Sequence, residues 1–183
     1  HVSRSEHQRQ SSVQLTIDFD YELWKQKRLV LAAIETSQLV QFKAPQGPTK
    51  NLSIQRGPRT RNAEHFIQYL VNEQVQARLY EKEEPQTSAA IFAWFARFER
   101  SLAELFGRPG LRLEFMKREY NFRFHDDDRT YDFNQLPAGF ASAIRILAEL
   151  ILRINAQGLD QEEPAGVVLI DEVDAFLHPA LQE

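Results

Sequence analysis

Hydrophobic and polar positions recur with two different periods along the chain, which predicts both strands and helices. Residues 13–19 alternate Val, Leu, Ile and Phe with polar residues, the period of a strand with one wet face. The apolar run at residues 29–34 fits either a buried strand or the end of a helix, since periodicity alone does not separate them. Residues 44–62 are rich in Pro and Gly, so we expect a loop there.

Two amphipathic helices are predicted between residues 62 and 106. We expect Asn62 to cap the first, whose apolar stripe runs from Phe66 to Leu79 and ends near the acidic segment 81–85. Thr87 is expected to cap the second, which Gly107 ends. Aromatic residues at this helical spacing are more typical of a core than of a surface that stacks bases. They are Phe92, Trp94, Phe95, Phe98 and Phe106.

The second half of the chain predicts antiparallel strands, a helix and a last strand. Residues 111–133 alternate around a polar hairpin tip at residues 125–129. After a loop at residues 134–138, a helix is expected that ends at Gly158. Its polar side carries Arg145, Glu149 and Arg153, four residues apart, a spacing that allows pairing in water. Residues 166–170 are continuously apolar, as in a strand covered on both faces.

Composition narrows the class of protein. The 183 residues are 43% hydrophobic and 26% charged, the balance of a chain that buries a core. The net charge of −4 gives no overall basic field toward nucleic acid, although a local basic groove stays open. The absence of cysteine excludes disulfides and thiol catalysis and fits a reducing cytoplasm. No apolar run approaches the ~20 residues of a membrane helix, so we expect a cytoplasmic protein without membrane contact.

The strongest chemical pattern is an apolar strand that delivers two carboxylates, Asp171 and Glu172. In open α/β sheets the ligand crevice lies at the carboxyl ends of the strands. In nucleotide hydrolysis, the first carboxylate of such a pair holds Mg²⁺, usually through water. The second orients and deprotonates the attacking water. The alternative is that the strand ends in acids only because the following loop is wet.

A second pattern precedes this strand by one helix. Leu136, Pro137, Ala138, Gly139 and Phe140 open the predicted helix. A glycine there lets the backbone approach a ligand, and the free N–H groups and helix dipole favour an anion. The plainer interpretation is an ordinary glycine turn at a helix start.

Together, the two patterns resemble ABC-type ATPases of the SMC, RecF and OLD group, including AAA-type ATPases of bacterial defence systems. Residues 136–140 look like the signature motif, and residues 167–179 look like the Walker B strand and D-loop. In the D-loop, residues 177–179 (Leu-His-Pro) match the family pattern, whereas Val173, Asp174 and Phe176 depart from it. The resemblance covers residues 111–183 with specific motifs and the preceding helices only loosely.

The resemblance implies an α/β fold of the P-loop NTPase type, in its ABC-ATPase form, with β-strands and a helical insertion. It implies ATP and Mg²⁺ as cofactors, with Asp171 holding the metal and Glu172 activating water. The helix start at residues 136–140 would bind the γ-phosphate of a nucleotide held by the other subunit of a homodimer. Asp174 would contact that subunit, and His178 would lie near the interface, although a structural turn is the plainer role for His178.

Two departures from the family pattern matter. Pro137 stands where the signature has Ser, and Ser142 is the next hydroxyl, one turn further along. No Gly-x-x-x-x-Gly-Lys-Ser/Thr phosphate loop occurs, and residues 47–50 have suitable types in the wrong order. We therefore expect the chain to be a portion of a longer ATPase.

Other candidate residues favour plain interpretations. Three adjacent acids, residues 126–128, fit a solvated turn better than a metal site. His65 fits a surface or partly packed position. The basic residues between 43 and 61 fit a charged loop better than a phosphate-backbone groove; they are Lys43, Lys50, Arg56, Arg59 and Arg61.

The sequence thus predicts a flexible lead-in at residues 1–12, a strand and loop region at 13–61, a helical insertion at 62–106 and an ATPase core portion at 107–183. The expected function is ATP binding and hydrolysis by a dimer, in DNA-related or anti-phage complexes, with a nuclease or other effector as a further partner. Nucleic acid stays open as a partner. The alternative is a non-hydrolysing module that keeps the fold in order to pair with a partner.

Overall fold

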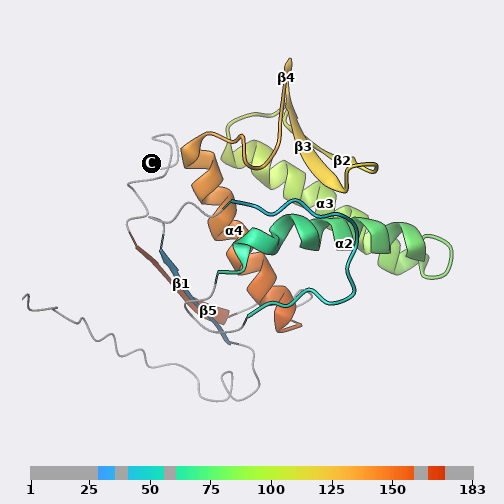
Figure 1. The fold of residues 1–183 in the computed structure, drawn as a ribbon, viewed down its shortest axis with the longest axis horizontal. Helices are drawn as coiled ribbons and strands as arrows, with labels where there is room; N and C mark the ends of the chain where they lie inside the picture. The colour runs from blue at the N-terminus through green and yellow to red at the C-terminus, as the bar shows by residue number, and fades with distance from the viewer. Residues whose placement is uncertain (1–28, 36–40, 56–60, 159–164, 172–183) are drawn as a thin grey trace, which may run out of the picture.

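The computed structural model describes residues 29–35, 41–55, 61–158 and 165–171, and it is a mixed α/β structure with one parallel and one antiparallel sheet (Figure 1). Along the chain its elements are β1 (Leu29–Glu35), η1 (Ala63–His65), α2 (Phe66–Tyr80), α3 (Pro85–Leu105), β2 (Arg112–Met116), β3 (Asn121–Asp126), β4 (Arg129–Tyr131), α4 (Ala138–Ala156) and β5 (Ala165–Asp171). The strand predicted at residues 13–19 and the lead-in at residues 1–12 lie outside the described residues.

The parallel sheet consists of β1 and β5, which pair in register from Leu29 opposite Ala165 to Glu35 opposite Asp171. The ambiguous apolar run at residues 29–34 is therefore a strand. The prediction that the last strand is covered on both faces is wrong for the described residues. Val168 is 39% exposed and Leu169 50% exposed, and because neighbours in a strand point to opposite faces, both faces of β5 present apolar surface.

The antiparallel sheet confirms the strands predicted at residues 111–133. Leu113 and Phe115 lie opposite Phe124 and Phe122 in the β2–β3 ladder, and this face packs on the hydrophobic core. The β3–β4 hairpin turns at Asp127, whose φ of 50° is left-handed. Asp tolerates that region better than most residues, which explains why acids occupy this turn.

Helices α2 and α3 pack against each other and against the antiparallel sheet around a single aromatic-rich core. Phe66 makes edge contacts with both Phe98 and Phe133 in this core. Phe95, Phe98 and Phe106 are buried, so most of the predicted aromatic stripe is core. Trp94 is partly buried against the core, whereas Phe92 lies beneath the guanidinium of Arg78.

The helix boundaries differ in detail from those predicted. Helix α3 begins at Pro85 with Glu84 at its N-cap, not at Thr87, whose hydroxyl donates instead to the Glu84 carboxylate at 3.1 Å. Proline suits the first helical position because its missing N–H would have no partner inside the helix. The predicted stop at Gly107 is confirmed, since its φ of 60° is left-handed and the N–H of Arg108 reaches back to the carbonyl of Ala103.

Helix α4 crosses the molecule between the core and the parallel sheet (Figure 1). Its end at Gly158 is as predicted, with a φ of 71°. Glu149 and Arg153 do pair across one helical turn, as their spacing predicts, but not in water, because their side chains are only 6% and 2% exposed. Among the described residues, no helix combines the length and the apolar character that crossing a membrane needs.

Candidate functional site

The carboxyl ends of β1 and β5 form one edge of the parallel sheet, and an acidic residue occupies the last position of each strand. Asp171 is exposed there, and Glu35 is its partner in the register. An exposed carboxylate at the carboxyl end of a parallel strand suits Mg²⁺, which binds one or two carboxylates and keeps most of its waters.

The other site residues predicted after β5 are Glu172, Asp174 and His178, which lie outside the described residues. Among the residues that the structure does describe, no three His, Asp or Glu side chains lie close enough to hold a metal ion between them.

The start of α4 is exposed and carries the residues of the proposed signature. Pro137 is the N-cap in an extended conformation (φ −53°, ψ 144°), and its carbonyl accepts the N–H of Ala141 at 2.9 Å. Ala138 is exposed and Gly139 half-buried. The first N–H groups of a helix have no partner within it, so they favour an anion at this point. Ser142 is buried at 4% exposure, so its hydroxyl is not offered at the helix start and does not replace the signature Ser.

Hydrogen bonds and packing fix the loop that leads into α4. The Asp132 carboxylate accepts the N–H groups of Asn134 and Gln135 at 2.8 and 3.1 Å. The Asn134 side chain accepts the N–H of Phe42 through Oδ1 at 2.9 Å and donates to the carbonyl of Phe42 through Nδ2 at 3.0 Å. Leu136 is buried. The loop before the helix therefore holds its start. Asp132 forms the turn typical of Asp, in which the side chain accepts the backbone N–H two residues further on.

Aromatic packing joins the first turn of α4 to the end of α3. The rings of Phe140 and Phe106 have centroids 4.2 Å apart. Phe106 is the C-cap residue of α3. The exposed helix start thus rests on the same core that α2 and α3 share.

Helix α4 runs antiparallel to β1, as two side-chain contacts show. Arg153 Nη1 donates to the carbonyl of Leu31 at 2.8 Å, and Gln157 Nε2 to that of Leu29 at 3.4 Å. The two donors are separated by a helical rise of about 6 Å, which matches a strand rise of about 6.6 Å between the acceptors. Each turn toward the start of α4 therefore advances along β1 toward its carboxyl end (Figure 1).

The same alignment relates the helix start to the sheet edge. From Arg153 back to Gly139 the helix rises about 21 Å, whereas β1 continues from Leu31 to Glu35 for only about 13 Å. The start of α4 therefore projects about 8 Å beyond the strand ends along the helix direction. Asp171 and Gly139 lie at the same end of the structure.

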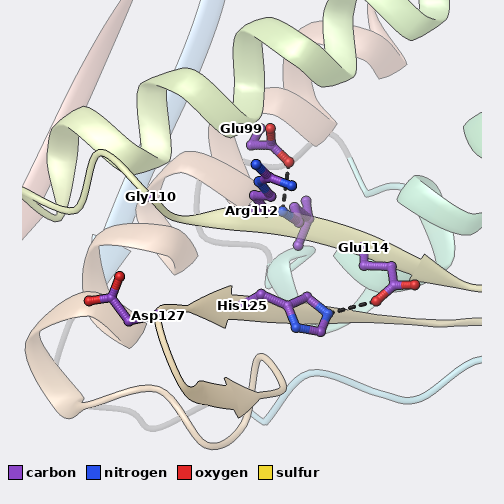
Figure 2. Close-up of a pocket in the computed structure, with 7 residues that line it drawn as sticks. Glu99, Gly110, Arg112, Glu114, His125 and Asp127 are labelled. Atoms are coloured by element: carbon purple, nitrogen blue, oxygen red, sulfur yellow. Dashed lines mark hydrogen bonds and ion pairs between the residues drawn. The ribbon is translucent and has the colours of Figure 1, made fainter.

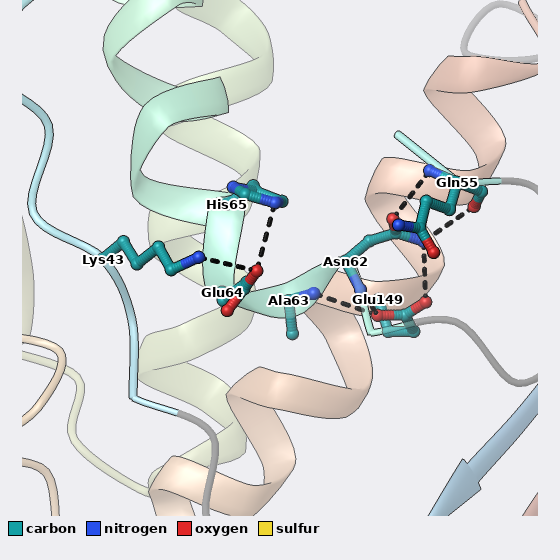
Figure 3. A network of polar contacts seen from close by, with 7 residues as sticks. All are labelled: Lys43, Gln55, Asn62, Ala63, Glu64, His65 and Glu149. Atoms are coloured by element: carbon teal, nitrogen blue, oxygen red, sulfur yellow. Dashed lines mark hydrogen bonds and ion pairs between the residues drawn. The ribbon is translucent and has the colours of Figure 1, made fainter. Parts of the chain in front are cut away.

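A buried polar network holds α4 against the start of η1, the short helix that leads into α2 (Figure 3). Glu149 Oε2 accepts the backbone N–H groups of Asn62 and Ala63 at 2.6 and 3.0 Å. Its Oε1 accepts from Asn62 Nδ2 at 3.0 Å and from Arg153 Nε at 2.8 Å. A carboxylate is stabilised at a helix start by the exposed N–H groups and the helix dipole. Asn62 does occupy an N-cap, that of η1, but its side chain makes no capping hydrogen bond. It bonds to the backbone of Gln55 instead.

The two remaining ion pairs in this view share Glu64 and are partly exposed. Lys43 Nζ bonds Glu64 Oε1 at 2.8 Å, and His65 Nε2 lies 3.2 Å from the same carboxylate (Figure 3). Lys43 and His65 thus have protein partners, in line with the plain interpretations of both residues.

A separate cleft of about 640 Å³ lies between α3 and the outer face of β2 and β3 (Figure 2). His125 Nε2 lies 2.6 Å from Glu114 Oε2, and Thr130 Oγ1 lies 3.2 Å from His125 Nδ1. Glu99 accepts the N–H of Leu113 at 2.7 Å, which occupies an edge donor of β2 that another strand could otherwise pair with. These groups serve the hairpin, and we assign the cleft no ligand.

Among the described residues, the pKa values of Tyr131 and Arg145 are shifted. Burial, with a smaller contribution from Asp126, raises the pKa of Tyr131 above its usual 10.0. Burial lowers the pKa of Arg145 on α4; a guanidinium nevertheless stays charged at neutral pH. Neither shift creates a general acid or base near neutrality.

No protein-family model matches the chain, and no curated protein matches it at a significant level. The structure by itself defines the class as a mixed α/β protein with one parallel and one antiparallel sheet.

Proposed function

We propose that this chain is part of an ABC-type ATPase that binds and hydrolyses ATP between two subunits. The observation that carries the proposal is the antiparallel packing of α4 on a parallel sheet. Its contacts with β1 bring the Gly139 helix start and Asp171 to one end of the structure. A surface with both features can give its acids to one nucleotide and its helix start to another.

In this proposal the residues of the sheet edge act on the nucleotide of their own subunit. Bound Mg²⁺ would neutralise charge on the phosphates and supply a fixed template for transfer. Asp171 would hold the metal through a carboxylate oxygen or an intervening water. Glu172, the next residue, would orient the attacking water and take its proton.

The helix start acts on the nucleotide of the other subunit. The N–H groups at Ala138 and Gly139 would face the γ-phosphate and stabilise charge that develops on it. Asp174 would contact the opposite subunit, with His178 close to that interface. Binding therefore joins two subunits and hydrolysis releases them, a cycle suited to a DNA-related or antiviral complex with a nuclease or another effector.

The exposed apolar residues of β5 support a larger sheet in the complete protein. Val168 and Leu169 are exposed on opposite faces, whereas parallel strands in α/β proteins are covered on both faces. Further elements of the ATPase would cover them.

A second candidate function is a non-hydrolysing module that pairs with a partner. One observation favours it: Pro137 occupies the N-cap and offers no hydroxyl to a phosphate, and Ser142 is buried. The two functions differ in turnover, which makes them separable.

The test is phosphate release by the complete gene product, with Glu172→Gln as the variant. We expect wild type to hydrolyse ATP, and the variant to lose turnover while its nucleotide-bound dimer persists longer. Glu104→Gln, at an exposed position of α3, is the control and should retain turnover. Turnover retained by Glu172→Gln removes Glu172 from its role as base, and an inactive wild type supports the pairing module.

A further inference from the structure

We infer that Glu149 and Arg153 form a positioning pair, which holds α4 on β1 and thereby sets the separation between the Gly139 helix start and Asp171. The inference rests on the proposed function for its role, but its geometric claim is separate. Neither residue belongs to the motifs that resemble the ATPase family.

The pair is the point where four segments of the chain meet. Glu149 binds the start of η1 through the N–H groups of Asn62 and Ala63. Asn62 in turn pairs with the backbone of Gln55. Arg153 completes the connection by donating to Leu31 of β1.

The geometry of the pair suits positioning better than simple packing. A hydrophobic contact between a helix and a strand tolerates sliding, because it has no direction. The Arg153 guanidinium, by contrast, bonds Glu149 through Nε and Nη2, both at 2.8 Å, and the Leu31 carbonyl through Nη1, also at 2.8 Å. A slide of α4 along β1 leaves the bonds between Arg153 and Glu149 intact, because both residues are on α4, but it breaks the bond from Arg153 to the Leu31 carbonyl. That bond lies inside a site where no water replaces it, since the side chains of Glu149 and Arg153 are 6% and 2% exposed.

A change in the packing at Arg153 affects the position of the helix start relative to the sheet, because α4 moves as one rigid element. Arg153 lies near the far end of α4, about 21 Å from Gly139, so a change in the angle between α4 and β1 changes the separation of Gly139 from the sheet edge by an amount that grows with this distance. The loop before α4 anchors the near end to Phe42. Loss of the pair therefore leaves α4 fixed at its start to the core and free to shift against the sheet, which changes the Gly139 to Asp171 separation.

Spin labels measure this separation directly, and a chain without native cysteine takes labels only where they are introduced. The labels go on Ala138→Cys at the exposed helix start and Leu169→Cys on exposed β5. We expect a single distance in the parent chain. Glu149→Gln should shift that distance by about 2 Å, the size of helix movements at repacked contacts, or broaden its distribution.

Ile144→Val is the matched control, because it removes a methyl group from a buried position of the same helix and leaves the pair intact. It should leave the distance unchanged. Arg153→Lys is a second variant in case Glu149→Gln fails to fold, because it keeps the charge and the bonds of Glu149 to Asn62 and Ala63 while losing the Nη1 donor to Leu31. A folded Glu149→Gln or Arg153→Lys chain with the parent distance overturns the inference.

The link to hydrolysis is read separately in the complete gene product. Glu149→Gln should lower kcat by about tenfold or more, as a misplaced catalytic element does, with the KM for ATP unchanged because the sheet edge still binds its own nucleotide. A shifted distance without ATPase activity in wild type leaves the positioning geometry standing and removes the proposed function. A shifted distance with an unchanged kcat removes the role of the pair in hydrolysis.

Discussion

The Glu149–Arg153 pair provides the sharpest stability prediction. The spacing in the sequence and the burial in the structure predict different contributions of this pair to the free energy of unfolding. An exposed pair at this spacing on a helix contributes about 0.3–0.5 kcal/mol. In the structure, both side chains are buried, at 6% and 2% exposure. Removing one member of a buried pair leaves an uncompensated charge and costs about 3–5 kcal/mol. Glu149→Gln should therefore lower the free energy of unfolding by about 3–5 kcal/mol.

The assay is urea unfolding of the chain, followed by the circular dichroism of its helices. Glu104→Gln at an exposed position should change stability by less than about 0.5 kcal/mol. The double variant Glu149→Gln/Arg153→Met should lose less than Glu149→Gln alone, because it leaves no buried charge without a partner. A loss below about 1 kcal/mol for Glu149→Gln would refute the buried network, since that is the range of exposed pairs.

Three further predictions concern the strands and their turns. Asp127→Gly should raise the free energy of unfolding by up to about 1 kcal/mol, because glycine adopts the left-handed φ of 50° without strain; thermal unfolding measures this, and a lower Tm contradicts it. Gly166→Ala should destabilise the β1–β5 pairing by about 1–3 kcal/mol, because an added Cβ would collide with the carbonyl oxygen of Val30; unchanged urea unfolding contradicts it. Burial and Asp126 raise the pKa of Tyr131 above 10.0, so its contribution to stability is present below pH 10.0 and is lost as the pH rises through the folded pKa. Tyr131→Phe should reduce that alkaline loss, and equal loss in both proteins contradicts it.

Local patterns were sufficient to predict most described elements. Alternation at residues 111–133 predicted the antiparallel strands, because one face of that sheet is buried and the other wet. Gly107 and Gly158 marked helix ends because both adopt a left-handed φ. These signals depend only on neighbouring residues, so a single sequence contains them.

Features that depend on distant partners were predicted wrongly or missed. The sequence places Glu149 on the polar side of a helix, and only the fold brings the backbone of Asn62 and Ala63 to it from far along the chain. That contact also takes over the capping role predicted for Asn62. Glu35 could be placed opposite Asp171 only once β1 was known to be a strand parallel to β5.

The candidate site divides in the same way. The residues around Gly139 and the acid at Asp171 follow from sequence motifs, and the structure describes both segments. That Gly139 and Asp171 lie at the same end of the structure follows from the bonds of Arg153 and Gln157 to β1. Neither Arg153 nor Gln157 belongs to a recognised motif. The roles of Glu172, Asp174 and His178 stay predictions.

Mixing two inactive variants tests the central claim that each nucleotide site is shared between subunits. Glu172→Gln removes the base from its own subunit's site, and Gly139→Asp places a repelling carboxylate at the helix start that serves the other subunit. A mixed dimer keeps one intact site, built from Glu172 of one subunit and Gly139 of its partner. We predict that the mixture recovers ATP hydrolysis, up to about a quarter of the wild-type rate for random pairing in a twofold-symmetric dimer. A mixture no more active than either variant alone would contradict the account.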